Sequence, residues 1–123
     1  MKIVILGSGN VAFHLAKAFH QKKIPVAQIF GRNESDLKAI SSEFNIPYST
    51  EELVNADFYL IAVNDDSVEE ISKKISEKNC LVAHTSGSLP VDILKGTYRK
   101  ASFYPLQTFS KSKDLNYAEI PFF

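Results

Sequence analysis

Hydrophobic residues of this chain fall into short continuous runs, separated by segments with helical spacing. Runs without polar alternation are typical of strands covered on both faces, and apolar residues three and four apart indicate helices. The alternation of the two predicts an α/β fold in three layers with a doubly wound, mostly parallel sheet. The expected strands are KIVIL, VAQIF, DFYLIAV, CLVAH and ASFY, and the helical positions are Val11, Leu15, Ala18 and Phe19, then Leu37, Ile40 and Phe44, then Val68, Ile71 and Ile75.

Capping residues predict where several of these elements begin. Asn33 is followed three residues later by Asp36, a variant of the capping box, so a helix is expected to start there. Asp65 or Asp66 is expected to cap the third helix. The stretch IPYSTEEL predicts a minimal strand followed by a turn that Thr50 caps.

Length and charge limit the classes of function. The 123 residues fit one domain, residues 1–123, and the 14 basic and 14 acidic residues balance, so no global field favours nucleic acid or an anionic membrane. Cys80 is the one cysteine and lies in an apolar run, which predicts a buried thiol. No apolar stretch approaches the roughly 20 residues that span a bilayer, and no signal peptide is expected, so the chain is expected to be cytoplasmic.

The first expected strand leads directly into a GxGxxA motif that opens a helix. Gly7 permits a tight turn, Gly9 lets a pyrophosphate approach the backbone, and the small Ala12 lets helix and strand pack closely. The helix N-terminus adds unpaired N–H groups and partial positive charge. The motif in this position predicts dinucleotide binding, with a purely structural bend as the alternative. Its residues are Gly7, Ser8, Gly9, Asn10, Val11 and Ala12.

The end of the second expected strand indicates which dinucleotide is bound. An acidic residue that binds ribose is expected about 20 residues beyond the glycines, but the chain reads Phe30-Gly31-Arg32-Asn33 there. Arg32 and Asn33 can instead reach a 2′-phosphate, which favours NADP over NAD. The alternative for Arg32 is a solvated loop arginine.

Five segments carry a resemblance to a known family: ILGSGNVAFHLAKAF, IFGRN, ADFYLIAVNDDSVEEI, VAHTSGSLPVDIL and FYPLQTFSK. Together they resemble the Rossmann-like half of bacterial proteins with domain of unknown function 2520 (DUF2520), relatives of pyrroline-5-carboxylate reductase, ketopantoate reductase and prephenate dehydrogenase. The resemblance implies that Ala62, Val63 and Asn64 lie near the ribose and nicotinamide of NADP, and Val68 near the adenine. It also implies a following helical domain that forms a dimer and much of the substrate pocket, which this chain is expected to lack.

Two residues after the fifth expected strand are candidates for catalysis. His84 can donate a proton or hydrogen bond to a carbonyl undergoing hydride transfer, or it can simply bond a nearby backbone carbonyl. Ser86 can present its hydroxyl to a carboxylate, or it can belong to an ordinary turn. His14 and His20 are six residues apart on different helix faces, so no metal site is predicted.

These features predict the NADP-binding domain of an oxidoreductase that transfers hydride between NADP(H) and a small carbonyl, imine or hydroxy acid. A non-enzymatic dinucleotide sensor is the alternative, because the fold alone does not define a reaction. The domain alone is expected to bind the cofactor without turnover. The longer protein is expected to act on a small-molecule substrate as a homodimer, without nucleic-acid or membrane partners.

Overall fold

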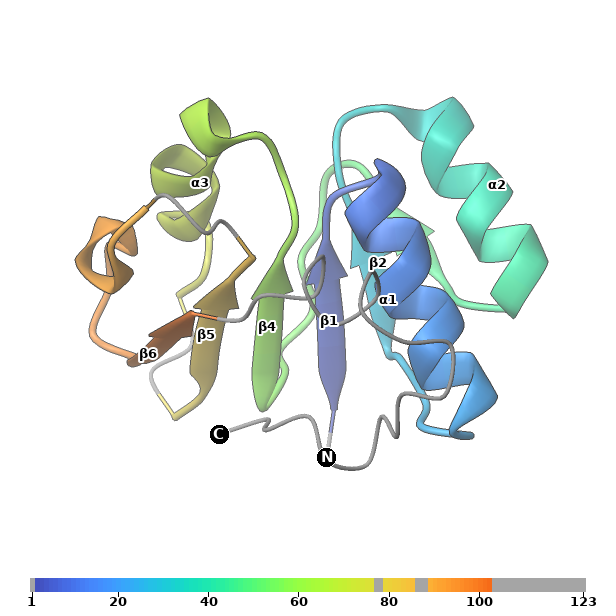
Figure 1. Ribbon diagram of the computed structural model, residues 1–123, viewed down its shortest axis with the longest axis horizontal. Helices are drawn as coiled ribbons and strands as arrows, with labels where there is room; N and C mark the ends of the chain where they lie inside the picture. Colours follow the sequence, from blue (N-terminus) through green and yellow to red (C-terminus); the bar gives the residue numbers. More distant parts are fainter. Residues whose placement is uncertain (1, 77–78, 86–88, 103–123) are drawn as a thin grey trace.

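The computed structural model describes residues 2–76, 79–85 and 89–102, and within them it forms one six-stranded sheet (Figure 1). All neighbouring strands are parallel, in the order β3-β2-β1-β4-β5-β6. Because the order reverses between β1 and β4, the sheet is doubly wound, as the hydrophobic pattern predicts. The strands are β1 (Ile3–Leu6), β2 (Gln28–Phe30), β3 (Tyr48–Ser49), β4 (Phe58–Ile61), β5 (Leu81–His84) and β6 (Arg99–Ser102).

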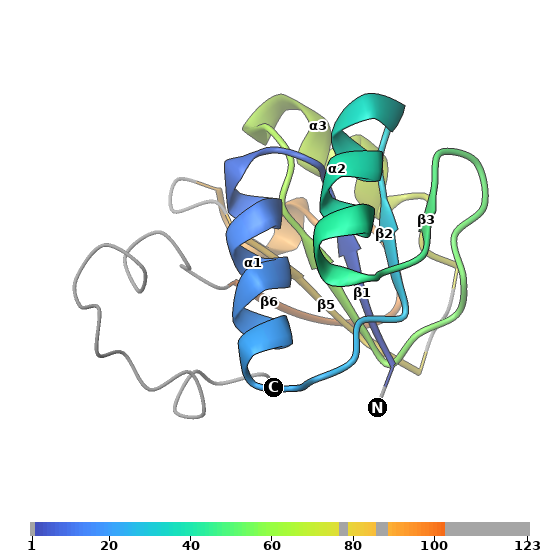
Figure 2. The same ribbon diagram turned by 90° about the vertical axis from the view of Figure 1, so that its right-hand side faces the viewer.

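Helices cover both faces of the sheet and give two hydrophobic cores. Along β1, Ile3 and Ile5 pack into a core with α1 and α2, which lie side by side in Figures 1 and 2. Val4 and Leu6 pack into a second core with α3 and the 3₁₀ helix region. This two-sided burial explains why the strands lack polar alternation. The helices are α1 (Asn10–Gln21), α2 (Glu34–Phe44), α3 (Asp65–Ser72) and the 3₁₀ helix η1 (Val91–Ile93).

Capping confirms one of the expected helix starts and corrects another. Asn33 caps α2, since its Oδ1 accepts a hydrogen bond from the Asp36 N–H at 3.1 Å. The expectation for α3 was wrong: its N-cap is Asn64, and Asp65 and Asp66 belong to the first turn. Acidic side chains there still stabilise the helix, because they complement its positive end.

The turn after β3 and the position of β6 also differ from the sequence expectations. Ser49, not Thr50, caps the turn, because its Oγ accepts hydrogen bonds from two following N–H groups, those of residues 51 and 52. The last strand begins at Arg99, two residues before the expected run. Pairing with β5 sets this register, and charged residues are common on an edge strand. Cys80 is buried, as predicted.

A buried polar network joins α3 to the segment that leads into β6. The fully buried Ser72 donates to the Glu69 carbonyl at 2.6 Å and accepts from the Lys95 N–H at 3.0 Å. The Tyr98 hydroxyl lies 3.0 Å from the Ser72 carbonyl and 2.9 Å from the Lys95 carbonyl. Burial raises the pKa of Tyr98, and this outweighs the hydrogen bond to Ser72, which lowers it. The neutral phenol therefore stabilises the fold.

Tyr98→Phe is expected to lower the free energy of unfolding by about 1 kcal/mol near neutral pH, because it removes a buried hydroxyl donor from two carbonyls. The raised pKa means that the stabilisation is complete below the ordinary value of 10.0 and is lost as pH rises through the folded-state pKa. Urea unfolding at pH 7 to 11 should show a steeper alkaline loss for the parent than for the variant. Parallel pH profiles would contradict this.

Candidate functional site

A cleft of about 530 Å³ lies at the carboxyl edge of the sheet. Its walls come from the segments that follow β1, β2, β4 and β5, together with α3 and the start of α2. Open α/β sheets bind ligands at this edge, where the strand order reverses. The lining residues are Gly7, Ser8, Gly9, Asn10, Val11, Phe30, Gly31, Arg32, Asn33, Asp36, Thr50, Ala62, Val63, Asn64, Ser67, Glu70, Ile71, Lys74 and Thr85.

The two glycines of the turn have different physical roles. Gly7 has a φ of +139°, and a Cβ there would lie 2.1 Å from the Ala62 carbonyl oxygen, so only glycine allows this close approach. Gly9 has a negative φ, and a Cβ there would meet nothing within 4 Å. Protein atoms therefore do not require glycine at this second position, whereas a ligand against the backbone would.

The start of α1 suits an anion better than the start of either other described α-helix. Its N-cap, Gly9, offers no side-chain hydrogen bond, and its first turn contains no acidic residue. By contrast, the first turns of α2 and α3 each carry two acids. The first N–H groups and positive end of α1 are thus available to a phosphate. Ala12 is fully buried in the core below, as expected for close helix packing.

The loop after β2 places two polar side chains at the cleft. Arg32 is exposed, and its Nη2 donates a hydrogen bond to the Ser67 Oγ at 3.3 Å. The Asn33 Oδ1 is occupied by the cap of α2, which leaves the Nδ2 group as a hydrogen-bond donor. Glu34 accepts from the Tyr48 hydroxyl at 3.2 Å and does not line the cleft. Asp36 does line it, a carboxylate that sequence spacing missed.

Ala62, Val63 and Asn64 follow β4 and line the cleft, and their place beside the ribose and nicotinamide stays a prediction. Val68 does not line the cleft. It is buried in the second core, on the side of α3 that faces the sheet. Its role near the adenine stays a prediction. One face of α3 and the turn that follows it supply further cleft residues that sequence reasoning missed, and their spacing of three and four residues could have identified them together. They are Ser67, Glu70, Ile71 and Lys74.

Of the two candidates for catalysis, His84 and Ser86, the structure describes only His84. His84 is fully buried at the end of β5, with its Nε2 3.0 Å from the Pro90 carbonyl oxygen. This contact supports the structural alternative, and a catalytic role stays a prediction. The following residue, Thr85, lines the cleft and donates from its Oγ1 to the Ile61 carbonyl at 3.2 Å. Ser86 lies outside the described residues.

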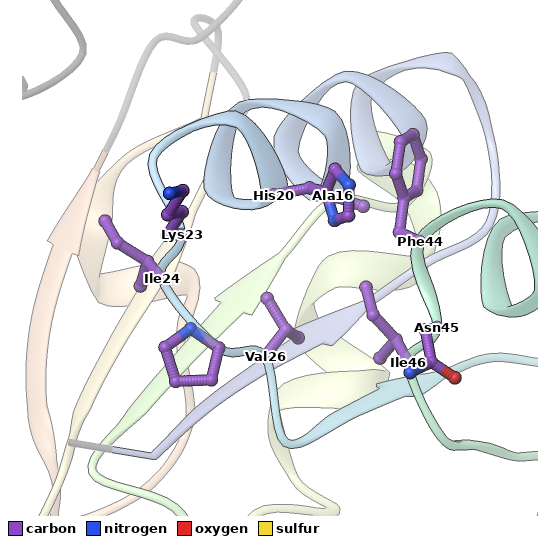
Figure 3. Close-up of a pocket in the computed structure, with 9 residues that line it drawn as sticks. Ala16, His20, Lys23, Ile24, Val26, Phe44, Asn45 and Ile46 are labelled. Atoms are coloured by element: carbon purple, nitrogen blue, oxygen red, sulfur yellow. The ribbon is translucent and has the colours of Figure 1, made fainter.

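A second, smaller depression of about 220 Å³ lies near the amino ends of β2 and β3 (Figure 3). The last turns of α1 and α2 form one side, where the rings of His20 and Phe44 are 5.4 Å apart. Residues 23–26 and 45–46 complete it. Its lining includes no glycine and no helix N-terminus, so it lacks the features that recognise phosphate.

Two other features are absent from the residues that the structure describes. Over residues 2–76, 79–85 and 89–102, no group of three or more His, Cys, Asp or Glu side chains is placed to hold a metal ion. Within the same ranges, no helix has both the length and the apolar character needed to cross a membrane. The carboxyl-edge cleft, with the glycine turn and the start of α1, is the candidate site that the geometry supports.

The strand order, the glycine turn and the cleft at the carboxyl edge define a domain of the Rossmann-like α/β class. A family model described as NADP oxidoreductase, coenzyme F420-dependent, matches residues 2–94, and the chain belongs to this family. The family assignment implies a nicotinamide dinucleotide cofactor. No curated protein sequence matches the chain significantly.

Solved structures share this architecture. A candidate NADP oxidoreductase of Bacteroides fragilis is 31% identical with a TM-score of 0.79, over 98% of this chain and 49% of the other. An imine reductase of a Pseudomonas species is 16% identical, with a TM-score of 0.61 over 75% and 34% of the two chains. The 1-pyrroline-5-carboxylate reductase of Streptococcus pyogenes is 21% identical, with a TM-score of 0.59 over 76% of this chain and 37% of the other. This chain thus spans about half the length of the Bacteroides protein.

Gly9→Val is expected to abolish dinucleotide binding while the chain stays folded, because its side chain would occupy only the space that a pyrophosphate needs. Titration calorimetry with NADP and NAD measures the binding, and circular dichroism the fold. Gly7→Val is the matched control and is expected to unfold the chain, since its Cβ collides with Ala62. Unchanged binding by the Gly9 variant would show that the turn is only a bend.

Proposed function

We propose that the chain is the NADP-binding domain of an oxidoreductase that transfers hydride between NADP(H) and a small carbonyl, imine or hydroxy acid. The observation that carries the proposal is the pairing of two features in one cleft. The first feature is the glycine turn together with the start of α1, which has no side-chain cap. The second is Arg32, which stands where an acid that binds the ribose of NAD would be expected. The family assignment agrees with this chemistry.

The residues present fit the cofactor. The backbone at Gly9 and the first turn of α1 would hold the pyrophosphate. Among the described residues, no protein atom other than those of its chain neighbours lies within 4 Å of where a Cβ on residue 9 would stand, so a bound ligand explains the glycine there. Arg32 and the Nδ2 group of Asn33 would hold the 2′-phosphate. By resemblance, residues 62–64 would lie beside the nicotinamide ribose. When bound, the cofactor supplies or accepts the hydride, and the chain's residues bind and orient it.

Asp36 supports NAD as a second candidate cofactor. Its carboxylate lines the same cleft and could accept hydrogen bonds from ribose hydroxyls. It also opposes a 2′-phosphate by like-charge repulsion. We favour NADP because Arg32 forms no ion pair with a carboxylate among the residues that the structure describes, and its guanidinium can bind phosphate through two donors.

Arg32→Ala is expected to weaken NADP binding by about 1 to 3 kcal/mol, the range for a lost charge-assisted hydrogen bond, and to leave NAD binding nearly unchanged. Titration calorimetry with each cofactor measures both affinities. Asp36→Asn is the opposing control, which should strengthen NADP binding. Equal losses for both cofactors on Arg32→Ala would contradict the role of Arg32 in selecting NADP. A selective loss of NAD binding on Asp36→Asn would favour NAD instead.

We propose that a longer protein, of which this chain is one domain, completes the substrate side of the site. Since the chain spans about half of its Bacteroides relative, we propose that a second domain supplies most of the substrate pocket and the dimer contact. A hydride acceptor has to be held close to the nicotinamide and shielded from water, which one open sheet edge does not achieve. The chain alone should therefore bind the cofactor without turnover.

The longer protein is expected to oxidise NADPH with a member of a panel of keto acids, imines and aldehydes, whereas the 123-residue chain is not. Absorbance of NADPH measures the rate. Coenzyme F420 belongs in the panel because the family description names it. Binding without turnover on any acceptor would favour the dinucleotide sensor.

His84→Ala in the longer protein separates the two interpretations of that residue. A proton-transfer role predicts a loss of turnover of about 10² to 10⁴ with unchanged cofactor affinity. A structural role predicts nearly unchanged turnover in the folded enzyme and lower stability, because the Pro90 carbonyl loses its partner.

A further inference from the structure

The hydrogen bond between Arg32 and Ser67 joins two parts of the cleft that are distant in sequence. Arg32 lies between β2 and α2, whereas Ser67 lies in the first turn of α3, 35 residues later. Both residues line the cleft, and the Nη2 to Oγ distance is 3.3 Å. In the described part of the chain, this is the side-chain hydrogen bond that the Arg32 guanidinium makes.

Ser67 is not needed to form its own helix. The N-cap of α3 is Asn64, and no side-chain hydrogen bond caps the helix. The Ser67 N–H already donates to the Asn64 carbonyl at 2.8 Å, so the helix start is made by backbone. The hydroxyl is therefore available to act on Arg32, and alanine at this position should retain the helix.

A guanidinium can be held by Ser67 and still bind phosphate. Arginine carries five N–H donors in a planar fork, and the contact with Ser67 uses one of them. The remaining donors are sufficient for a two-point contact with a phosphate. A free arginine side chain loses much rotamer freedom when it binds, and a contact that already restrains it reduces that loss.

We propose that Ser67 is a positioning residue for cofactor selectivity: it holds the Arg32 guanidinium over the cleft in the free protein, ready for the 2′-phosphate of NADP. The inference rests on the proposed function, because it takes Arg32 as the 2′-phosphate ligand. Ser67 acts through Arg32, so its effect is specific for NADP and disappears when Arg32 is absent.

A double-mutant cycle on the chain tests the proposal, with titration of NADP and NAD by calorimetry. Ser67→Ala is expected to raise the Kd for NADP about threefold to tenfold, the range for one hydrogen bond, and to leave NAD unchanged. In the Arg32→Ala background, Ser67→Ala should cause no further loss. Ser67→Thr, which keeps the hydroxyl, should restore parental affinity for NADP.

Ser42→Ala is the matched control, since Ser42 is an exposed helical serine of α2 that does not line the cleft. Three results would overturn the proposal: Ser67→Ala weakens NADP and NAD binding equally, it has the same effect with and without Arg32, or it has no effect at all. If the parent prefers NADP and Arg32→Ala removes that preference, each of these results overturns the role of Ser67 alone. If the parent binds neither dinucleotide, the proposed function fails as well.

Discussion

The cleft depends on the close approach of the turn after β1 to the end of β4. Gly7 makes this approach possible, because its position has no room for a Cβ beside the Ala62 carbonyl. The Gly7 N–H donates to the Phe30 carbonyl and the Ala62 N–H to the Leu6 carbonyl, both at 2.7 Å. These bonds tie the turn to β2 and β4 together, and α1 therefore starts directly over the edge of the sheet.

Electrostatic recognition in this protein has to be local. The chain has no net formal charge, so it has no long-range field that would attract an anionic cofactor. In the proposed cofactor site, attraction comes instead from the start of α1 and from Arg32, both at the cleft. The role that we propose for Ser67 follows from this, because a single exposed cation binds more tightly when it is already held in place.

Much of the fold could be predicted from local sequence because burial on both faces leaves a strong signal. The continuous apolar runs located five of the six strands, although the last began two residues earlier than expected. Caps were less predictable. Asn33 caps α2 as expected, but Ser49 and Asn64 took the positions expected for neighbouring residues. Several side chains near a turn can accept the same N–H, and the exact backbone path selects among them.

The sequence by itself determined the strand and helix order, the glycine turn and the absence of an acid at the end of β2, because these follow from residue type and short spacing. Only the tertiary structure decided which residues from distant segments meet. It brought Ser67 to Arg32, placed Asp36 in the cleft and buried Val68 and His84. Helix rotation and strand register control these contacts, and both are set by packing between elements far apart in the chain.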